Sequence, residues 1–291
     1  MSRCRVTFPG SPADAAAALL RIAEQGGRPL VIGGGTLAVP WLSQGLVAPT
    51  DVVDLGRLAT DRIEESAETV RIGAMVSYQQ LIESRVVAAR LPLLQRMARG
   101  ITGGIQIRNQ ATLGGAACAA RPYSDAPGVL VALQVTMAVE GSTGRRNVPA
   151  QDFFVGPERP ALSATEVLVD MAVPGSVLDR PSGYYKLKLG ESSWPVVTAA
   201  CLLPRGDDQQ GCNLVLGGVG DVPLVVPVPQ ADPGELDRAR VSRAVAERVE
   251  ALPPDRLWGD VRADRDYRRR VAGEVAYRAV RRAVESREGA R

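Results

Sequence analysis

Two glycine-rich segments contain the residues of this sequence that are best suited to bind an anionic ligand. The first is Gly33-Gly34-Gly35-Thr36, and the second, much further along the chain, is Thr112-Leu113-Gly114-Gly115. Glycine lets backbone N–H groups approach an anion that a Cβ atom would hold away, and the threonine hydroxyl adds another donor. Each segment alone is equally consistent with a tight turn. Together they predict one extended ligand with two phosphates, bound from two sides.

The other reactive side chains narrow the chemistry further. The sequence has no histidine, which removes the commonest general base and the usual metal ligand. Its cysteines, Cys4, Cys118, Cys201 and Cys212, share no CxxC or other ligand spacing, so we predict no zinc site and no iron–sulfur cluster in this chain. Any reaction must therefore depend on a bound cofactor, on Asp, Glu, Lys or Tyr side chains, or on the shape of the site.

Charge and hydropathy exclude several classes of partner. The 35 basic and 32 acidic residues give a net charge of +3, which provides no electrostatic reason to expect nucleic acid. Acidic residues are interleaved in the arginine-rich segment 262–291, as is typical of a solvated helix face. The chain begins without an apolar signal segment, and no run reaches the ~18 apolar residues of a membrane span. We therefore expect a cytoplasmic protein that does not contact a membrane.

The segment 1–57 has the pattern of a small βαβ-like lobe. The residues Ser11 and Pro12 predict a helix start, and a glycine pair at 26–27 predicts its end. Short apolar runs at 29–32 and 51–55 predict two strands.

The same lobe also fits a weak dinucleotide-binding fingerprint of the Rossmann type. Gly33-x-Gly35-x-x-Ala38 follows a predicted strand, and Asp54 lies at a suitable distance. A Rossmann domain would continue with further strand–helix units at similar spacing, and the sequence after Asp54 lacks them. We therefore favour another fold.

The rest of the chain predicts two further units. Segment 58–176 is a second lobe, with a strand at 70–74, short helices near 78–83 and 93–97, a helix at 127–133, and strands at 135–139, 145–148 and 166–173. Segment 182–291 is a smaller C-terminal domain, with a three-stranded antiparallel sheet (184–189, 196–203 and 213–216) and helices near 235–252 and 265–284. The fold class is α+β, with two α/β lobes followed by this domain.

The motifs, taken in order, identify a family. The run 105–116 reads IQIRNQATLGGA, the upstream loop reads GGGT, and Pro122-Tyr123-Ser124-Asp125 closes the centre of the chain. In this order and spacing they resemble the FAD-binding (medium) subunit of molybdenum hydroxylases. This is the xanthine dehydrogenase and carbon monoxide dehydrogenase flavoprotein family, with a PCMH-type FAD-binding fold. The resemblance covers nearly the whole chain and includes stretches at 153–156, 166–174, 186–188 and 267–269.

The resemblance implies a cofactor and the residues that hold it, although it implies no catalytic residue. In the family, both glycine loops bind the FAD pyrophosphate, Asp125 contacts the sugar or linker, Leu168 lies near the adenine, and Lys186 lies near the isoalloxazine. Asp125 could equally cap a helix, and Lys186 could equally be solvent-exposed. The cofactor-binding residues implied here are Val31, Ile32, Gly33, Gly34, Gly35, Thr36, Leu37, Thr112, Gly114, Gly115, Ala116, Asp125, Leu168 and Lys186.

Several positions depart from the family pattern. Relatives usually have a polar residue where this chain has Leu37, an asparagine at Ala116 and an arginine at Leu189. Arg121 stands where relatives usually have a small residue. If each lost hydrogen bond is worth roughly 1 kcal/mol, FAD binding is weakened by orders of magnitude or lost.

The favoured function is an FAD-dependent oxidoreductase subunit. It would pass electrons between an iron–sulfur and molybdopterin partner and an acceptor, because this chain has no ligands for clusters or molybdenum. The alternative is a stand-alone protein: a flavin oxidase or, with FAD weakened or lost, a non-redox cyclase or isomerase in a biosynthetic pathway. Either way the small-molecule substrate or electron acceptor is not specified by the sequence.

Overall fold

The first lobe is a short parallel sheet with helices beside it. A computed structural model describes residues 4–205, 212–228 and 236–289. The strands are ordered β1-β3-β2 and run parallel, and the Ser11 side chain caps α1 by accepting from the Asp14 N–H. The elements are β1 (Arg5–Thr7), α1 (Pro12–Glu24), β2 (Pro29–Ile32), α2 (Ala38–Ser43) and β3 (Asp51–Asp54). β1 was not expected from the sequence. The parallel sheet ends after these strands, so the Rossmann alternative is wrong.

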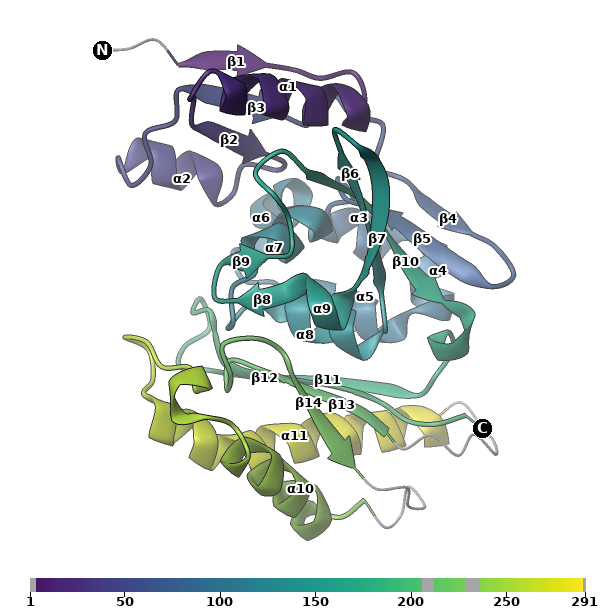
Figure 1. The fold of residues 1–291 in the computed structure, drawn as a ribbon. Coiled ribbons are helices and arrows are strands. Elements are labelled where there is room, and N and C mark those ends of the chain that lie inside the picture. The colour runs from purple at the N-terminus through teal and green to yellow at the C-terminus, as the bar shows by residue number, and fades with distance from the viewer. Residues whose placement is uncertain (1–3, 206–211, 229–235, 290–291) are drawn as a thin grey trace.

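The second lobe is built on an antiparallel sheet, ordered β4-β5-β10-β6-β7. Helices α3 to α8 pack on it around one buried core, and the lobe lies between the other two parts of the molecule in Figure 1. The strands are β4 (Ile63–Glu65), β5 (Thr69–Gly73), β6 (Thr136–Gly141), β7 (Gly144–Pro149) and β10 (Val167–Pro174), with a separate pair β8 (Phe154–Gly156) and β9 (Arg159–Pro160). The helices are α3 (Tyr78–Glu83), α4 (Arg85–Arg90), α5 (Pro92–Arg99), α6 (Gly104–Gln110), α7 (Leu113–Ala119), α8 (Asp125–Ala132) and α9 (Ala150–Phe153).

The C-terminal domain has a four-stranded antiparallel sheet, ordered β11-β12-β13-β14. The helices α10 and α11 cover one face, and α8 of the second lobe packs on the other (Figure 1). The elements are β11 (Ser182–Lys188), β12 (Pro195–Leu202), β13 (Cys212–Gly217), β14 (Leu224–Val228), α10 (Arg238–Glu250) and α11 (Arg265–Glu288), with 3-10 turns η1 (Gly175–Val177) and η3 (Pro254–Arg256). The expected start of α10 at Glu235 lies outside the described residues.

The sequence-based prediction of three strands in this sheet is wrong, because it omits β14. The sequence around β14 is rich in proline, which argues against a strand. Pro227 is tolerated because β14 is the edge strand, where a missing N–H breaks no ladder on its outer side. Along β14, Leu224, Val226 and Val228 are buried, whereas Val225 and Pro227 are exposed, so the strand covers the core with one face.

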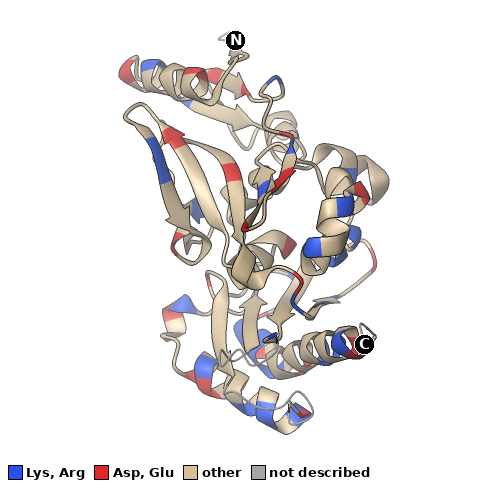
Figure 2. Ribbon diagram, turned by 90° about the vertical axis from the view of Figure 1, so that its right-hand side faces the viewer, with Lys and Arg blue, Asp and Glu red and all other residues tan. Residues whose placement is uncertain are grey.

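Charges on the outer helices are mixed in sign. Figure 2 shows basic and acidic residues interleaved along the C-terminal helices. Arg238 and Arg278 both pair with Glu274 at 2.7 Å, which joins α10 to α11. Within the described parts of the chain, no helix is long and apolar enough to cross a membrane. The domain boundaries at 57 and at 176–182 stay predictions.

A buried arginine network predicts an acid-sensitive step in stability. Burial opposes the charge of Asp260, but hydrogen bonds from Arg262 and the positive charges of Arg268 and Arg262 outweigh it and lower the pKa of Asp260 from 3.8 to about 2. Because the pKa of Asp260 is lower in the folded protein than in the unfolded chain, its carboxylate stabilises the fold at pH values above the ordinary pKa of 3.8. This stabilisation is lost as the pH falls through the pKa of the folded state. We expect the stability gap between the parent and Asp260→Asn to shrink from about pH 4 to about pH 2. Urea unfolding at several pH values measures it, and a constant gap would contradict the assignment.

Candidate functional site

A large cavity, with a volume of about 860 Å³, is lined by residues from all three parts of the chain. This volume lies in the range of sites for cofactors and other small molecules. Among the residues implied by the resemblance, those that line the cavity are Val31, Gly33, Gly34, Gly35, Thr36, Leu37, Thr112, Gly114, Gly115, Ala116, Asp125 and Leu168. Ile32 and Lys186 do not line it.

The loop that follows β2 presents free backbone donors to this cavity. Within the described residues, no protein acceptor receives a hydrogen bond from the N–H groups of Gly33, Gly34, Gly35 or Thr36. Gly35 has a φ of 73°, a left-handed conformation that favours glycine and turns the chain into α2. Four successive N–H groups without a protein acceptor, in residues that line a cavity, are available to bind a phosphate oxygen. This geometry fits the diphosphate of a dinucleotide cofactor.

The second glycine segment is arranged differently from the sequence-based expectation. Thr112 is the N-cap of α7, and its hydroxyl accepts the N–H of Gly115 at 3.0 Å. The N–H of Leu113 donates to Val76 O at 2.9 Å, and that of Gly114 donates to Ala74 O at 3.0 Å. These donors are therefore already paired within the protein, unlike the N–H groups of the first loop.

Close backbone packing explains two of the glycines independently of any ligand. A Cβ on Gly34 would lie 1.6 Å from Gln110 O, and a Cβ on Gly114 would lie 2.5 Å from Ala74 O. Both positions require glycine because one backbone crosses directly over another. Gly34 thus sets the distance between the first lobe and the segment that leads into α7.

Asp125 lies at the centre of a buried hydrogen-bond network. Its Oδ1 accepts from Tyr184 OH at 2.5 Å and from Lys186 Nζ at 2.7 Å, and Lys186 Nζ also donates to Gly100 O at 2.6 Å. Burial, followed by the charge of Asp125, raises the pKa of Tyr184 well above its ordinary value, so the phenol stays protonated and donates. Only 10% of the Lys186 side chain is exposed, and its ammonium group neutralises Asp125. The alternative of a solvent-exposed Lys186 is wrong.

The apolar part of the lining comes from strands and helix starts. Leu168 lies on β10 next to a bulge between Leu168 and Asp170, and it is buried. Leu37 and Ala116 also line the cavity, so two positions where the resemblance implies polar groups have apolar side chains here. Of the departures inferred from the sequence, Leu37, Ala116 and Arg121 therefore lie at the cavity wall, whereas Leu189 does not line the cavity.

Three further lining residues form a cluster around a guanidinium group. Arg121 lies over the rings of Trp41 and Trp194, with Cζ 5.3 Å and 5.7 Å from their centroids. Its Nε lies 3.4 Å from Glu158 Oε1. The sequence marked Arg121 only as a departure from the family. Trp41, in the short helix α2, and Glu158, in the turn between β8 and β9, gave no signal, because a single aromatic or acidic residue has no pattern.

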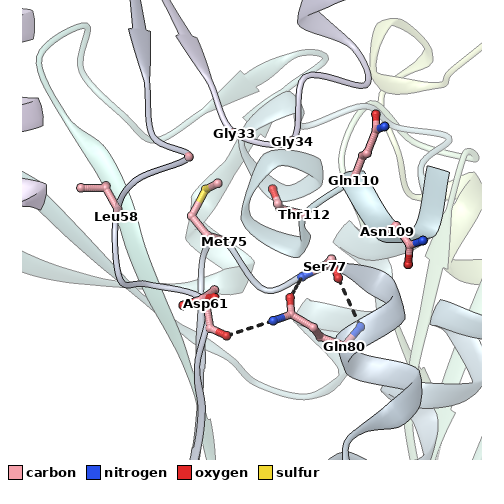
Figure 3. A pocket seen from close by; sticks show the side chains of 11 residues that line it. Gly33, Gly34, Leu58, Asp61, Met75, Ser77, Gln80, Asn109, Gln110 and Thr112 are labelled. Carbon is pink, nitrogen blue, oxygen red and sulfur yellow. Dashed lines mark hydrogen bonds between the residues drawn. The ribbon is translucent and has the colours of Figure 1, made fainter. Parts of the chain in front are cut away.

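A smaller pocket of about 300 Å³ adjoins the large cavity and shares Gly33, Gly34, Met75 and Thr112 with it. Figure 3 shows the hydrogen bonds that join Gln80 to Ser77 and Asp61 in this pocket. Ser77 and Gln80 form a reciprocal capping box at the start of α3, and Gln80 Nε2 also donates to Asp61 O at 3.4 Å. The pocket therefore extends the site on the side of the first glycine loop.

Comparison with known proteins identifies the family of the chain. The family described as the FAD binding domain in molybdopterin dehydrogenase matches residues 3–176. The carbon monoxide dehydrogenase medium chain of Hydrogenophaga pseudoflava is 30% identical over 280 residues, which cover 93% of this chain and 94% of that protein. The glyceraldehyde dehydrogenase medium chain of Sulfolobus acidocaldarius is 34% identical over 201 residues, which cover 68% and 69% of the two chains.

Solved structures agree with the sequence comparison. A chain of the Hydrogenophaga pseudoflava carbon monoxide dehydrogenase, in a form that lacks the Mo-pyranopterin moiety of its molybdenum cofactor, superposes with a TM-score of 0.86. The match is 28% identical and covers 98% of both chains. The sequence-based prediction of the α+β fold is thereby confirmed. The chain belongs to the family of FAD-binding medium subunits of the molybdenum hydroxylases, which are subunits of oxidoreductases.

Proposed function

We propose that this protein binds one FAD in the large cavity and passes electrons through it between an iron–sulfur and molybdopterin partner and a small-molecule acceptor. The observation that best supports this is the row of free N–H groups from Gly33 to Thr36 at the cavity wall. Bound FAD would supply redox chemistry that the side chains of the protein lack. The need for a partner follows from the ligands: the described residues contain no group of three or more His, Cys, Asp or Glu that could hold a metal.

The residues of this chain would bind and orient the cofactor. In this proposal the first glycine loop donates to the diphosphate, and the first turn of α7, with Thr112, Gly114, Gly115 and Ala116, shapes the wall beside it. Asp125 accepts a hydroxyl of the sugar or linker while Tyr184 and Lys186 hold its carboxylate in place. Leu168, Val31 and Leu37 complete the apolar lining, and Ile32 lies next to Val31 on β2 without lining the cavity.

A second candidate function is a stand-alone protein. The apolar wall at Leu37 and Ala116 supports it, because these residues cannot hydrogen-bond FAD. The paired N–H groups of Leu113, Gly114 and Gly115 support it as well. Such a protein would be a flavin oxidase, or a cyclase or isomerase that uses the cavity without redox chemistry.

Titration of FAD into the purified chain separates the two functions. We expect the protein to lose part of its flavin during purification, because the side-chain donors of relatives are missing. It should then rebind FAD in a one-to-one ratio, because the backbone donors of residues 33–36 remain. Flavin fluorescence and the visible spectrum measure both properties. Absence of binding at high FAD concentration would indicate that the cavity binds another ligand. The non-redox function would then be the favoured one.

A further inference from the structure

Arg121 is the one Lys or Arg among the described residues that line the large cavity. Three carboxylates line the same cavity: Asp125, Glu158 and Glu166. Asp125 is paired with Lys186 at 2.7 Å, and Glu166 is paired with Arg146 at 2.7 Å. An anion that enters the cavity thus meets one positive charge that is not already committed to a close ion pair.

The guanidinium of Arg121 has unused hydrogen-bonding capacity. Its Nε is buried without a hydrogen-bond partner, and the described residues accept no hydrogen bond from its other N–H groups. The contact with Glu158 is long, at 3.4 Å, and the Glu158 side chain is 62% exposed. A guanidinium presents five N–H donors, and leaving them unpaired in a largely buried position is costly. An acceptor that enters from the cavity would supply the missing partner.

Aromatic rings hold this guanidinium in place. Trp41 of the first lobe, Tyr123 of the second lobe and Trp194 of the C-terminal domain each have their ring centroid within 5.9 Å of its Cζ. Stacking on aromatic faces fixes a planar guanidinium while its N–H groups stay available at the edge. A fixed fork loses little entropy when it binds two oxygens at once. The cluster is thus preorganised for a planar or tetrahedral oxyanion.

We propose that Arg121 anchors an oxyanion, a phosphate or carboxylate group, of a molecule bound in the large cavity. This rests on the proposed function and gives it a chemical detail. Two sources provide that chemistry: the diphosphate of FAD itself, or an anionic group of the small molecule that exchanges electrons with it. In the first case Arg121 compensates for the polar side chains that Leu37 and Ala116 replace.

The test compares the parent with Arg121→Gln, which keeps a polar side chain and removes the charge. Arg256→Gln is the matched control, because Arg256 is paired with Asp221 at 2.8 Å and does not line the cavity. Thermal unfolding establishes that each variant is folded. Dissociation constants are then measured for FAD and for riboflavin, which has no phosphate, and for benzoate and inorganic phosphate on the FAD-loaded protein.

The outcomes distinguish the sources. Loss of about tenfold or more in FAD affinity with unchanged riboflavin affinity, as for one charge-assisted hydrogen bond, assigns the anchor to the diphosphate. Unchanged FAD affinity with lost benzoate or phosphate binding assigns it to the second molecule. Equal affinities of parent and variant for every probe would overturn the proposal. If the parent binds no FAD, the proposed function fails, and ADP and phosphate titrations of the same proteins still decide the anchor.

Discussion

Gly34→Ala is expected to lower both the stability of the protein and its affinity for FAD. The added Cβ would lie 1.6 Å from Gln110 O and 2.6 Å from Gln110 C, so a backbone segment and not a flexible side chain must move. Overpacking of this kind typically costs about 1–3 kcal/mol and sometimes more. The loop at 33–36 would shift away from Gln110, and the free N–H groups would no longer face one ligand together. FAD affinity should therefore fall by at least about tenfold.

Gly190→Ala is the control for this substitution. No atom lies within 4 Å of a Cβ at Gly190. That variant should therefore have the same free energy of unfolding and the same FAD affinity as the parent. Urea unfolding and FAD titration on the three proteins give the comparison. If Gly34→Ala retained the parent's stability and FAD affinity, the contact between the two lobes would not position the donor loop.

Arg268→Ala is expected to destabilise the C-terminal domain by about 3–5 kcal/mol. Arg268 is fully buried, and its guanidinium pairs with Asp260 Oδ1 at 2.8 Å. It also donates to Ala263 O, to Gly218 O at 3.0 Å and to Val196 O. Its removal takes this donor away from the carbonyls of Val196 and Gly218 and creates a cavity between α11 and the sheet, although Asp260 keeps Arg262 as a partner. A loss of this size is a large share of the roughly 5–15 kcal/mol by which a domain is stable.

Arg269→Ala tests whether this cost belongs to the buried network. Arg269 is the next residue on α11, is largely exposed, and lies 3.9 Å from Asp266. Exposed pairs of this kind contribute about 0–1 kcal/mol, so the control should stay close to the parent. Guanidinium chloride unfolding provides the free energies. A difference of less than about 1 kcal/mol between the two variants would show that Arg268 is not the organising residue.

Much of the fold could be predicted from local sequence signals. Ser11 and Pro12 specify the start of α1 because capping and the fixed φ of proline are properties of the residues themselves. The strands predicted at 135–139 and 145–148 correspond to β6 and β7. The order of the motifs indicated the family, which the comparisons confirm. β14 could not be predicted, because an edge position makes proline acceptable and only the complete sheet defines an edge.

The candidate site was likewise predicted in part from the sequence and decided in part by the tertiary structure. The residue types at 33–36 and 112–115 indicated anion binding, since glycine and threonine are suited to it wherever they occur. The sequence alone determined the local elements, the family motifs and the positions where polar side chains are missing. Only the tertiary structure decided which N–H groups remain free, because those of Leu113 and Gly114 are paired with carbonyls of a strand end far from them in sequence. It also placed Arg121 among rings from three parts of the chain, since such neighbours are set by packing and not by spacing.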